Sequence, residues 1–251
     1  MARAHIGGST ITPCTEFAAY EDFTKIFKTK VANNETERNS AYALRYQIYC
    51  IENQFENPAD FPDEREQDDL DERSVQGIVM HRKSRLVCGT ARLVLPKERE
   101  DEPEGTFFAL CPHADLLPEA STAEVSRFSS SKVLKRQCEL FPDTRRFMEQ
   151  SPLLPYLTVS LIAFTLQEAV RNDITHLCAI MKPSLMRLLG QFGVHFLPLG
   201  DLVEHHGRRQ PCYVPMNKLL IDMAREHPRV WEIATDYGRI FEEEKEQAQV
   251  A

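Results

Sequence analysis

The sequence lacks paired cysteines, a long uninterrupted apolar run and an excess of positive charge. Seven cysteines are spread singly and no C-x-x-C pair occurs. The odd number of isolated cysteines favours reduced thiols in a cytoplasmic protein over a disulfide framework. The amino terminus has no apolar signal core. The longest apolar stretch, residues 153–166, is interrupted by Pro155 and by Thr and Ser, so we expect no transmembrane segment.

The acidic balance limits the class of partner. The formal net charge is −8 and the isoelectric point is about 5.6, which argues against general nucleic-acid binding. A hydrophobic content of 42% and a charged content of 27% are typical of a globular protein. A chain of 251 residues can bury one substantial core.

Charged residues stand inside runs that are otherwise apolar or small. They are Arg45 in YALRYQIYCIE, Arg92 in VCGTARLVLP, and Glu124 and Arg127 in AEVSRFS, and a polar segment between them adds Asp68 and Asp71. A charge in such a run is costly to desolvate unless it is paired or used. The three arginines and the carboxylates Asp68, Asp71 and Glu124 could balance one another if the fold gathers them at one cleft. Such a cleft would be either a buried ion-pair network or a reaction centre.

The pattern of apolar residues predicts a mixed α/β architecture. Strands are expected at residues 22–31, 75–81, 85–95, 123–128, 176–181, 194–199 and 212–216. Helices are expected after a cap at Asn33 or Asn34, at 154–172, from Pro183 to Gly190 or Gly193, and at 217–225 and 230–249. Long loops are expected at 53–72 and 96–122, and a basic loop after 128. We divide the chain into an extension (1–20), a main domain (21–216) and a helical extension (217–251).

Four segments in this order carry a resemblance to a known family. They are LRYQIY at 44–49, EQDDLD at 66–71, GTARLVLP at 89–96 and EVSRF at 124–128. The chain resembles the acyl-homoserine-lactone synthases and N-acyl amino acid synthases, and looks closest to acyltransferases associated with exosortase/PEP-CTERM systems. The resemblance covers roughly residues 20–215. It implies the Gcn5-related N-acyltransferase (GNAT) fold, in which a mixed central sheet flanked by helices has two splayed strands that receive the pantetheine arm of a thioester.

The resemblance also implies a function. It implies transfer of a fatty acyl group from an acyl carrier protein (or coenzyme A) thioester to the amino group of an amino acid or similar small amine. The acyl donor is a co-substrate, and no permanently bound cofactor is expected. One alternative is acyl-homoserine-lactone synthesis from S-adenosylmethionine, which is disfavoured because the loop tryptophan of those synthases is replaced by Phe55. The other alternative is a non-catalytic carrier-binding module.

The chemistry needs a group that takes a proton from the amine, and Glu124 is the candidate because it lies inside a strand. Strand alternation puts Arg127 on the opposite face unless a bulge intervenes. Without a bulge, Arg127 is expected to pair with the loop that carries Asp68 and Asp71. Arg92 is expected to do the same or to bind the carboxylate of an amino-acid acceptor. A purely architectural salt-bridge cluster is the alternative.

Further residues are expected to contact substrate, and we expect no metal. The substrate-contacting set comprises Arg45, Tyr49, Phe55, Asp68, Asp71, Phe128, Tyr156, His206 and Arg209. Tyr156 is a weak candidate for protonating the leaving thiolate and could instead anchor its helix. The run Glu204-His205-His206 with Cys212 fits no closed zinc pattern.

The segment that follows the predicted strand at 123–128 helps to distinguish the two possible acyl donors. Residues 129–136, SSSKVLKR, contain no glycine, whereas most coenzyme A users of this fold have a glycine-rich turn that cradles pyrophosphate. The basic residues that follow could steer a strongly acidic carrier protein or could be solvated surface charge. They are Lys132, Lys135, Arg136, Arg145 and Arg146.

Overall fold

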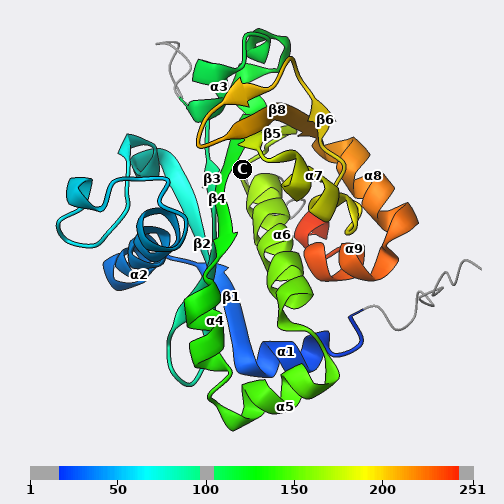
Figure 1. The fold of residues 1–251 in the computed structure, drawn as a ribbon. Coiled ribbons are helices and arrows are strands. Elements are labelled where there is room, and N and C mark those ends of the chain that lie inside the picture. Colours follow the sequence, from blue (N-terminus) through cyan, green and yellow to red (C-terminus); the bar gives the residue numbers. More distant parts are fainter. Residues whose placement is uncertain (1–16, 97–104, 243–251) are drawn as a thin grey trace, which may run out of the picture.

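A mixed β-sheet with helices on both faces forms the body of the protein (Figure 1). The computed structural model describes residues 17–96 and 105–242. The strands are β1 (Phe27–Val31), β2 (Ser74–His81), β3 (Val87–Val94), β4 (Thr122–Ser130), β5 (His176–Met181), β6 (Leu197–Pro198), β7 (Val203–Glu204) and β8 (Arg208–Pro215). Their order in the sheet is β1-β2-β3-β4-β5-β8-β6, with β7 paired to β8. Strands β4 and β5 run parallel, whereas the other paired strands are antiparallel.

The helices connect these strands and cover the sheet. They are α1 (Tyr20–Ile26), α2 (Glu35–Tyr46), α3 (Thr106–Leu110), α4 (Lys132–Cys138), α5 (Pro142–Gln150), α6 (Leu153–Arg171), α7 (Pro183–Gly190), α8 (Met216–Glu226) and α9 (Pro228–Ala234). Short helical segments are η1 (Gln47–Glu52), η2 (Pro58–Asp60), η3 (Asp69–Arg73), η4 (Ala114–Leu116) and η5 (Glu119–Ser121). Helix α2 lies on one face of the sheet and α6 on the other, as Figure 1 shows.

The sheet opens between its two central strands. Strands β4 and β5 are paired only from Thr122 and His176 to Glu124 and Cys178. Beyond these residues β4 continues to Ser130 and β5 to Met181 without pairing to each other. The splayed central strands expected from the family resemblance are therefore confirmed, and Glu124 stands at the point where the strands part.

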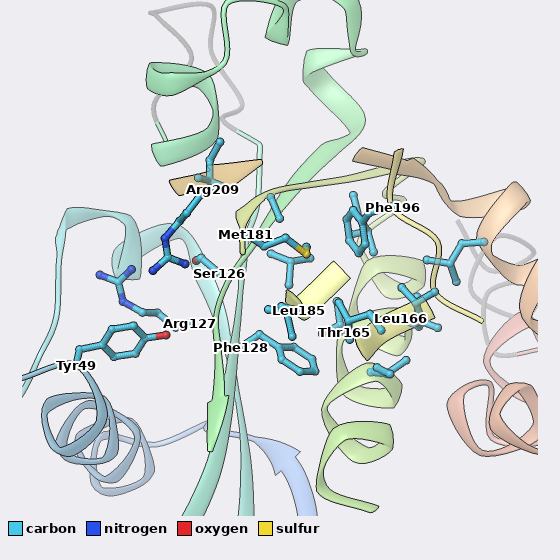
Figure 2. A pocket seen from close by; sticks show the side chains of 18 residues that line it. Tyr49, Ser126, Arg127, Phe128, Thr165, Leu166, Met181, Leu185, Phe196 and Arg209 are labelled. Carbon is cyan, nitrogen blue, oxygen red and sulfur yellow. The ribbon is translucent and has the colours of Figure 1, made fainter. Parts of the chain in front are cut away.

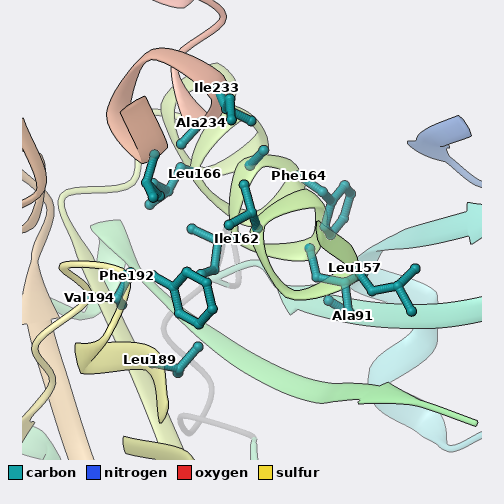
Figure 3. Close-up of a cluster of buried hydrophobic side chains, with 14 of the residues drawn as sticks. Ala91, Leu157, Ile162, Phe164, Leu166, Leu189, Phe192, Val194, Ile233 and Ala234 are labelled. Atoms are coloured by element: carbon teal, nitrogen blue, oxygen red, sulfur yellow. The ribbon is translucent and has the colours of Figure 1, made fainter. Parts of the chain in front are cut away.

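Helix α6 packs against the splayed sheet and forms the centre of the main core (Figure 3). Its sequence is apolar on nearly all sides, and 14 of its 19 residues are buried, with the sheet and helix α9 packed against it. Pro155 falls in its first turn, where the missing N–H has no intrahelical partner to lose. This helix is long and apolar enough to cross a membrane, but 78% of the apolar window is buried inside the fold, as in a core helix.

Several predicted elements are confirmed. The antiparallel pair β2 and β3, strand β5, helix α6 and helix α7 lie close to their expected bounds. Asn34 caps α2 by accepting the Glu37 N–H at 3.0 Å. Residues 243–251, which include the end of the expected last helix, lie outside the described residues, as do most residues of the expected N-terminal extension.

Other predictions were wrong. Residues 20–26 form helix α1, and only 27–31 form a strand, because Phe23 and Phe27 also satisfy a helical spacing of four. The expected basic loop forms α4 and α5, which begin at a Ser131 cap and at Pro142. The expected strand at 194–199 is reduced to Leu197–Pro198.

Candidate active site

A β-bulge in β4 arranges the residues beside the opening. Arg92 of β3 lies opposite Ser126 and Thr90 lies opposite Ser129, so two β4 residues face the single residue between them. Arg127 takes a positive φ of 52° at this point. The bulge turns Arg127 toward the acidic loop, while Phe128 packs with the main core. A bulge that brings Arg127 to the side of Glu124 was one of the two arrangements weighed from the sequence, and the pairing with the loop that carries Asp68 occurs as well.

Arg45, on α2, is fully buried between two carboxylates. Its Nε lies 2.6 Å from Glu66 Oε2, and its two terminal nitrogens lie 2.6 and 3.0 Å from the oxygens of Asp71. Glu66 is also buried. The bidentate geometry and the burial of Arg45 and Glu66 make this a strong, fixed ion pair.

Arg92 is fully buried and lies against the same loop. Its Nη1 lies 2.5 Å from Asp68 Oδ1 and 2.9 Å from Asp71 Oδ1, and its Nε donates to Ser126 Oγ at 2.9 Å. Asp68 also caps η3, and Asp71 Oδ2 accepts a hydrogen bond from the Asp68 N–H. These bonds hold the loop that carries Asp68 and Asp71 against β3 and β4.

Arg127 completes the charge cluster of three arginines and three carboxylates. Its Nη2 lies 2.8 Å from Glu66 Oε1 and 3.2 Å from Asp68 Oδ2, and its guanidinium lies over the Tyr49 ring at 5.0 Å. Burial acts to raise the pKa of Glu66, but hydrogen bonds from Arg127 and Arg45 outweigh it and lower that pKa to about 2. Glu66 therefore remains ionised at neutral pH.

The carboxylates of the cluster differ from the expected set. Glu66 takes the position that we expected for Glu124, and sequence reasoning did not select it. The available signal was its place as the first residue of the EQDDLD segment.

Glu124 lies beside the cluster with no direct arginine partner among the described residues. It is 3% exposed and accepts the Phe107 N–H at 3.0 Å. Its Oε2 lies only 2.6 Å from the position that a Cβ would take at Gly105, so this close approach requires glycine. Burial raises the pKa of Glu124, although Arg92 and Arg127 act in the opposite direction. A carboxyl group with a raised pKa beside a strand opening is suited to take up and release a proton.

A cavity passes through the opening between β4 and β5. It encloses about 660 Å³ of space between atoms, including its opening to solvent. Figure 2 shows Tyr49, Ser126, Arg127 and Arg209 on one side of β4, and the apolar side chains together with Thr165 on the other. The polar lining residues are Tyr49, Ser126, Arg127, Thr165 and Arg209, and the apolar ones include Phe128, Ile162, Leu166, Leu185, Leu189, Phe196 and Leu219. Such a cavity can hold a polar group at its mouth and a hydrocarbon chain in its interior.

A second cavity, of about 850 Å³ of space between atoms, adjoins the first. The two share Tyr49, Phe128, Leu185 and Arg209. The second is also lined by Phe55, over whose ring lie Lys182 Nζ at 4.9 Å and the Arg209 guanidinium at 5.6 Å. His206 lines neither cavity; its ring packs on Phe55 with ring centroids 5.6 Å apart, and its Nε2 lies 3.3 Å from Glu56 Oε1. The expected residues Tyr49, Phe55, Phe128 and Arg209 thus gather at one mouth.

The N-terminus of α4 is occupied by a side chain of the protein. Glu52, the last residue of the π-helical segment η1, accepts hydrogen bonds from the Ser131 hydroxyl and from the backbone N–H groups of Lys132 at 3.1 Å and Val133 at 3.5 Å. These are the unpaired N–H groups that could otherwise bind a phosphate. Sequence reasoning expected a weak phosphate cradle here but did not find Glu52.

The remaining expected residues lie elsewhere. Tyr156 is buried in an aromatic cluster with Phe17, Phe23 and Phe147 and lines neither cavity, which suits a role in anchoring α6 and not a contact with substrate. The basic residues lie on α4 and α5 without ion pairs to other described residues, and all but Lys135 are exposed. They are Lys132, Lys135, Arg136, Arg145 and Arg146. Across residues 17–96 and 105–242, no group of His, Cys, Asp or Glu is placed to hold a metal ion.

Comparison with known proteins agrees with this geometry. Residues 44–137 match the family model described as acetyltransferase (GNAT) domain. No curated protein is significantly similar to the chain in sequence.

Solved structures show the same fold. The coenzyme A-dependent acyl-homoserine lactone synthase BjaI is similar with a TM-score of 0.58 and 19% identity, covering 82% of this chain and 89% of BjaI. The acyl-homoserine lactone synthase LasI is similar with a TM-score of 0.56 and 16% identity, covering 78% of this chain and 94% of LasI. FeeM, an N-acyl amino acid synthase from uncultured soil microbes, is similar with a TM-score of 0.51 and 15% identity, covering 80% of this chain and 95% of FeeM. The fold is therefore the mixed α/β GNAT fold.

Proposed function

We propose that this chain, which carries a GNAT acyltransferase domain, moves a fatty acyl group from a carrier thioester to the amino group of an amino acid or similar small amine. The cavity between β4 and β5 is the observation that supports this most directly. It joins a polar mouth to an apolar interior where the sheet opens. The buried carboxyl group of Glu124 lines neither cavity, but it belongs to the last residue of β4 that pairs with β5, next to Val125, which lines the first cavity. A thioester lying across the opening would have its acyl chain in the apolar part.

Glu124 is proposed to accept a proton from the attacking amine, directly or through one water molecule. The amine nitrogen then bonds to the thioester carbonyl carbon, the carbon–sulfur bond breaks, and the proton is returned to the departing thiol. Backbone N–H groups left unpaired by the β4 bulge are suited to stabilise the oxyanion of the tetrahedral intermediate. Arg92 and Arg127 hold the acidic loop and the bulge in place for this step.

An acyl carrier protein is the preferred donor. Glu52 places a carboxylate on the α4 N–H groups, and a second anion such as pyrophosphate would be repelled there. The exposed basic residues of α4 and α5 are suited to attract a strongly acidic carrier. Coenzyme A is the other donor to test, since BjaI is a coenzyme A-dependent enzyme of the same fold. We also propose that the chain is related to the acyltransferases associated with exosortase/PEP-CTERM systems and that it acts in the cytoplasm.

The test is acyl transfer by the purified chain. Acyl carrier protein or coenzyme A thioesters are mixed with amino acids, thiol release is followed with a thiol reagent, and the product is identified by mass spectrometry. We expect an acylated amino acid, and at least about a 100-fold slower reaction for Glu124→Gln. Glu119→Gln, on the exposed η5 segment, is the matched control and should retain full activity.

Two other outcomes would replace the proposal. Release of methylthioadenosine from S-adenosylmethionine would identify a lactone synthase. Tight binding of the carrier protein without turnover of any acceptor would identify a non-catalytic binding module.

A further inference from the structure

Arg209 is an arginine of the cavity mouth without a carboxylate partner among the described residues. It lies on β8, is partly buried, and lines both cavities. Its Nε donates to the His205 carbonyl oxygen at 2.5 Å and its Nη2 to the His206 carbonyl oxygen at 3.5 Å, while its guanidinium lies over Phe55. One edge of the guanidinium is thus fixed by backbone and ring contacts, and its Nη1 makes no bond within the described part of the chain.

The other arginines of the site already form ion pairs with carboxylates. Three arginines face three carboxylates in a cluster with no excess charge: Arg45, Arg92 and Arg127 with Glu66, Asp68 and Asp71. Arg92, the residue that the sequence suggested for an acceptor carboxylate, is fully buried and lines neither cavity. Its Nη2 is buried without a hydrogen-bond partner among the described residues, but an anion in either cavity would not contact it.

The electrostatics around Arg209 favour an anion. Burial and repulsion from Arg127 lower the pKa of Arg209, so its charge is poorly compensated. Lys182 adds a second positive charge over the same Phe55 ring. His205 contributes none at neutral pH, because burial and its cationic neighbours lower its pKa to about 4. A negative group at this mouth would relieve the imbalance.

We infer that Arg209 binds the carboxylate of the acceptor, and that the acceptor is therefore an α-amino acid and not a simple amine. This rests on the proposed function. The free edge of a guanidinium can bind a carboxylate, and a single carbon separates the carboxylate from the amine of an α-amino acid. Figure 2 shows Arg209 on the same side of β4 as Ser126 and Arg127, so an amine held in this way lies at the strand opening.

The acyl donor also carries an anion, the phosphate of its pantetheine arm, and it approaches the same opening. Phosphate and carboxylate share the chemistry that an arginine recognises. If Arg209 binds the acceptor carboxylate, a substitution at Arg209 raises the KM for the acceptor. If it binds the pantetheine phosphate, the substitution raises the KM for the acyl donor, so the test measures both.

The test compares an amino acid with its carboxamide as acceptors, using wild-type protein and Arg209→Gln. Because Arg209→Gln removes the proposed charge-assisted hydrogen bonds to the carboxylate, we expect it to raise the KM for the amino acid about 10- to 100-fold. The KM for the carboxamide and the KM for the acyl donor should stay unchanged. Turnover of the carboxamide by the variant also shows that the variant is folded.

Two further variants sharpen the result. Arg209→Lys keeps the charge but not the planar fork, and it should give an intermediate KM for the amino acid. Arg208→Gln changes the neighbouring exposed residue, which lines neither cavity, and should leave every KM unchanged.

Failure of this inference can be told apart from failure of the proposed function. If the wild-type protein acylates amino acids and Arg209→Gln does so with unchanged KM, the assignment of Arg209 is wrong. If the variant loses affinity for the donor only, Arg209 binds the phosphate of the pantetheine arm. If the wild-type protein acylates neither acceptor, the proposed function itself is wrong.

Discussion

Glu66 and Glu124 are two buried glutamates of one site whose surroundings move their pKa values in opposite directions. Glu66 has two arginine partners, which lower its pKa to about 2 against the effect of burial. Glu124 has one backbone N–H donor, and burial raises its pKa. A permanently ionised carboxylate can hold structure, whereas a carboxyl group with a raised pKa can take up and release a proton. The division of roles between the two follows from their hydrogen-bond partners and not from their burial.

Glu124→Gln should separate activity from stability. Because the folded state raises the pKa of Glu124, the stability associated with this group is present below its ordinary pKa of 4.5 and is lost as the pH rises through the folded value. We expect Glu124→Gln to be at least as stable as wild type near neutral pH and equally stable in acid, because a glutamine can still accept the Phe107 N–H. Thermal melting across pH measures this. A variant that is less stable near neutral pH would contradict the raised pKa.

Arg45→Met should destabilise the protein strongly. It removes a fully buried guanidinium and leaves Glu66 and Asp71 without that partner, which typically costs about 3–5 kcal/mol. Urea denaturation near neutral pH measures the loss. Arg38→Met, on the exposed side of the same helix, is the matched control and should change stability by no more than about 0.5 kcal/mol. The ionised state of Glu66 also predicts that wild-type stability falls as the pH drops from 4.5 to about 2.

At this scale the sequence predicted the arginines better than their partners. Charges inside apolar runs indicated Arg45, Arg92 and Arg127, and the structure brings all three together. Which carboxylate pairs with which arginine depends on where the acidic loop crosses the sheet. For that reason Glu66 was missed and Glu124 was expected in its place.

At the scale of elements, two local irregularities place functional side chains. The β4 bulge turns Arg127 and Phe128 to different sides of the sheet. The π-helical segment η1 continues α2 and presents Tyr49 to the cavities and Glu52 to the N-terminus of α4. Such irregularities are frequent at functional sites because they redirect a side chain without ending the element. The sequence raised the bulge only as an alternative, since its existence depends on the register between β3 and β4.

The helices that the sequence missed carried signals of their own. Ser131 caps α4 by accepting the Leu134 N–H at 3.0 Å, and Pro142 begins α5. The sequence prediction for this region was a basic loop. Charge says little about secondary structure, whereas caps and prolines at helix starts are direct signals.

Gly77→Ala should disturb the contact between β2 and α6. A methyl group at Gly77 would overlap the ring of Phe164, and a ring in a packed core can move only by straining its neighbours. We expect a loss of about 1–3 kcal/mol in urea denaturation, partly recovered by Phe164→Leu in the same chain. Gly190→Ala, where a methyl group meets only ordinary contacts, is the control and should be neutral or slightly stabilising. Equal losses in both variants would show that the close packing is not the cause.

At the scale of the whole molecule, the cavity is assembled from segments that are distant in the sequence. Its lining comes from η1, β4, α6, β5, α7, β8 and α8, and it exists because β4 and β5 separate after Glu124. The order of elements indicated the splay through its resemblance to a known fold. The path of the cavity could not be read from the sequence, because α6 is apolar nearly all round and core and cavity residues look alike in it.

Thr165 and Thr158 provide a matched test of the path proposed for the acyl chain. Both are buried on α6 and donate to the carbonyl oxygen four residues earlier, but only Thr165 lines the cavity. Thr165→Leu fills part of the cavity, so we expect activity with long acyl chains to fall about 10-fold or more relative to short ones, because the loss of a few methylene contacts is worth 1–3 kcal/mol. Thr158→Leu should leave the preference unchanged. The measurement is kcat/KM over a series of acyl lengths, and a shift in both variants or in neither would place the acyl chain outside this cavity.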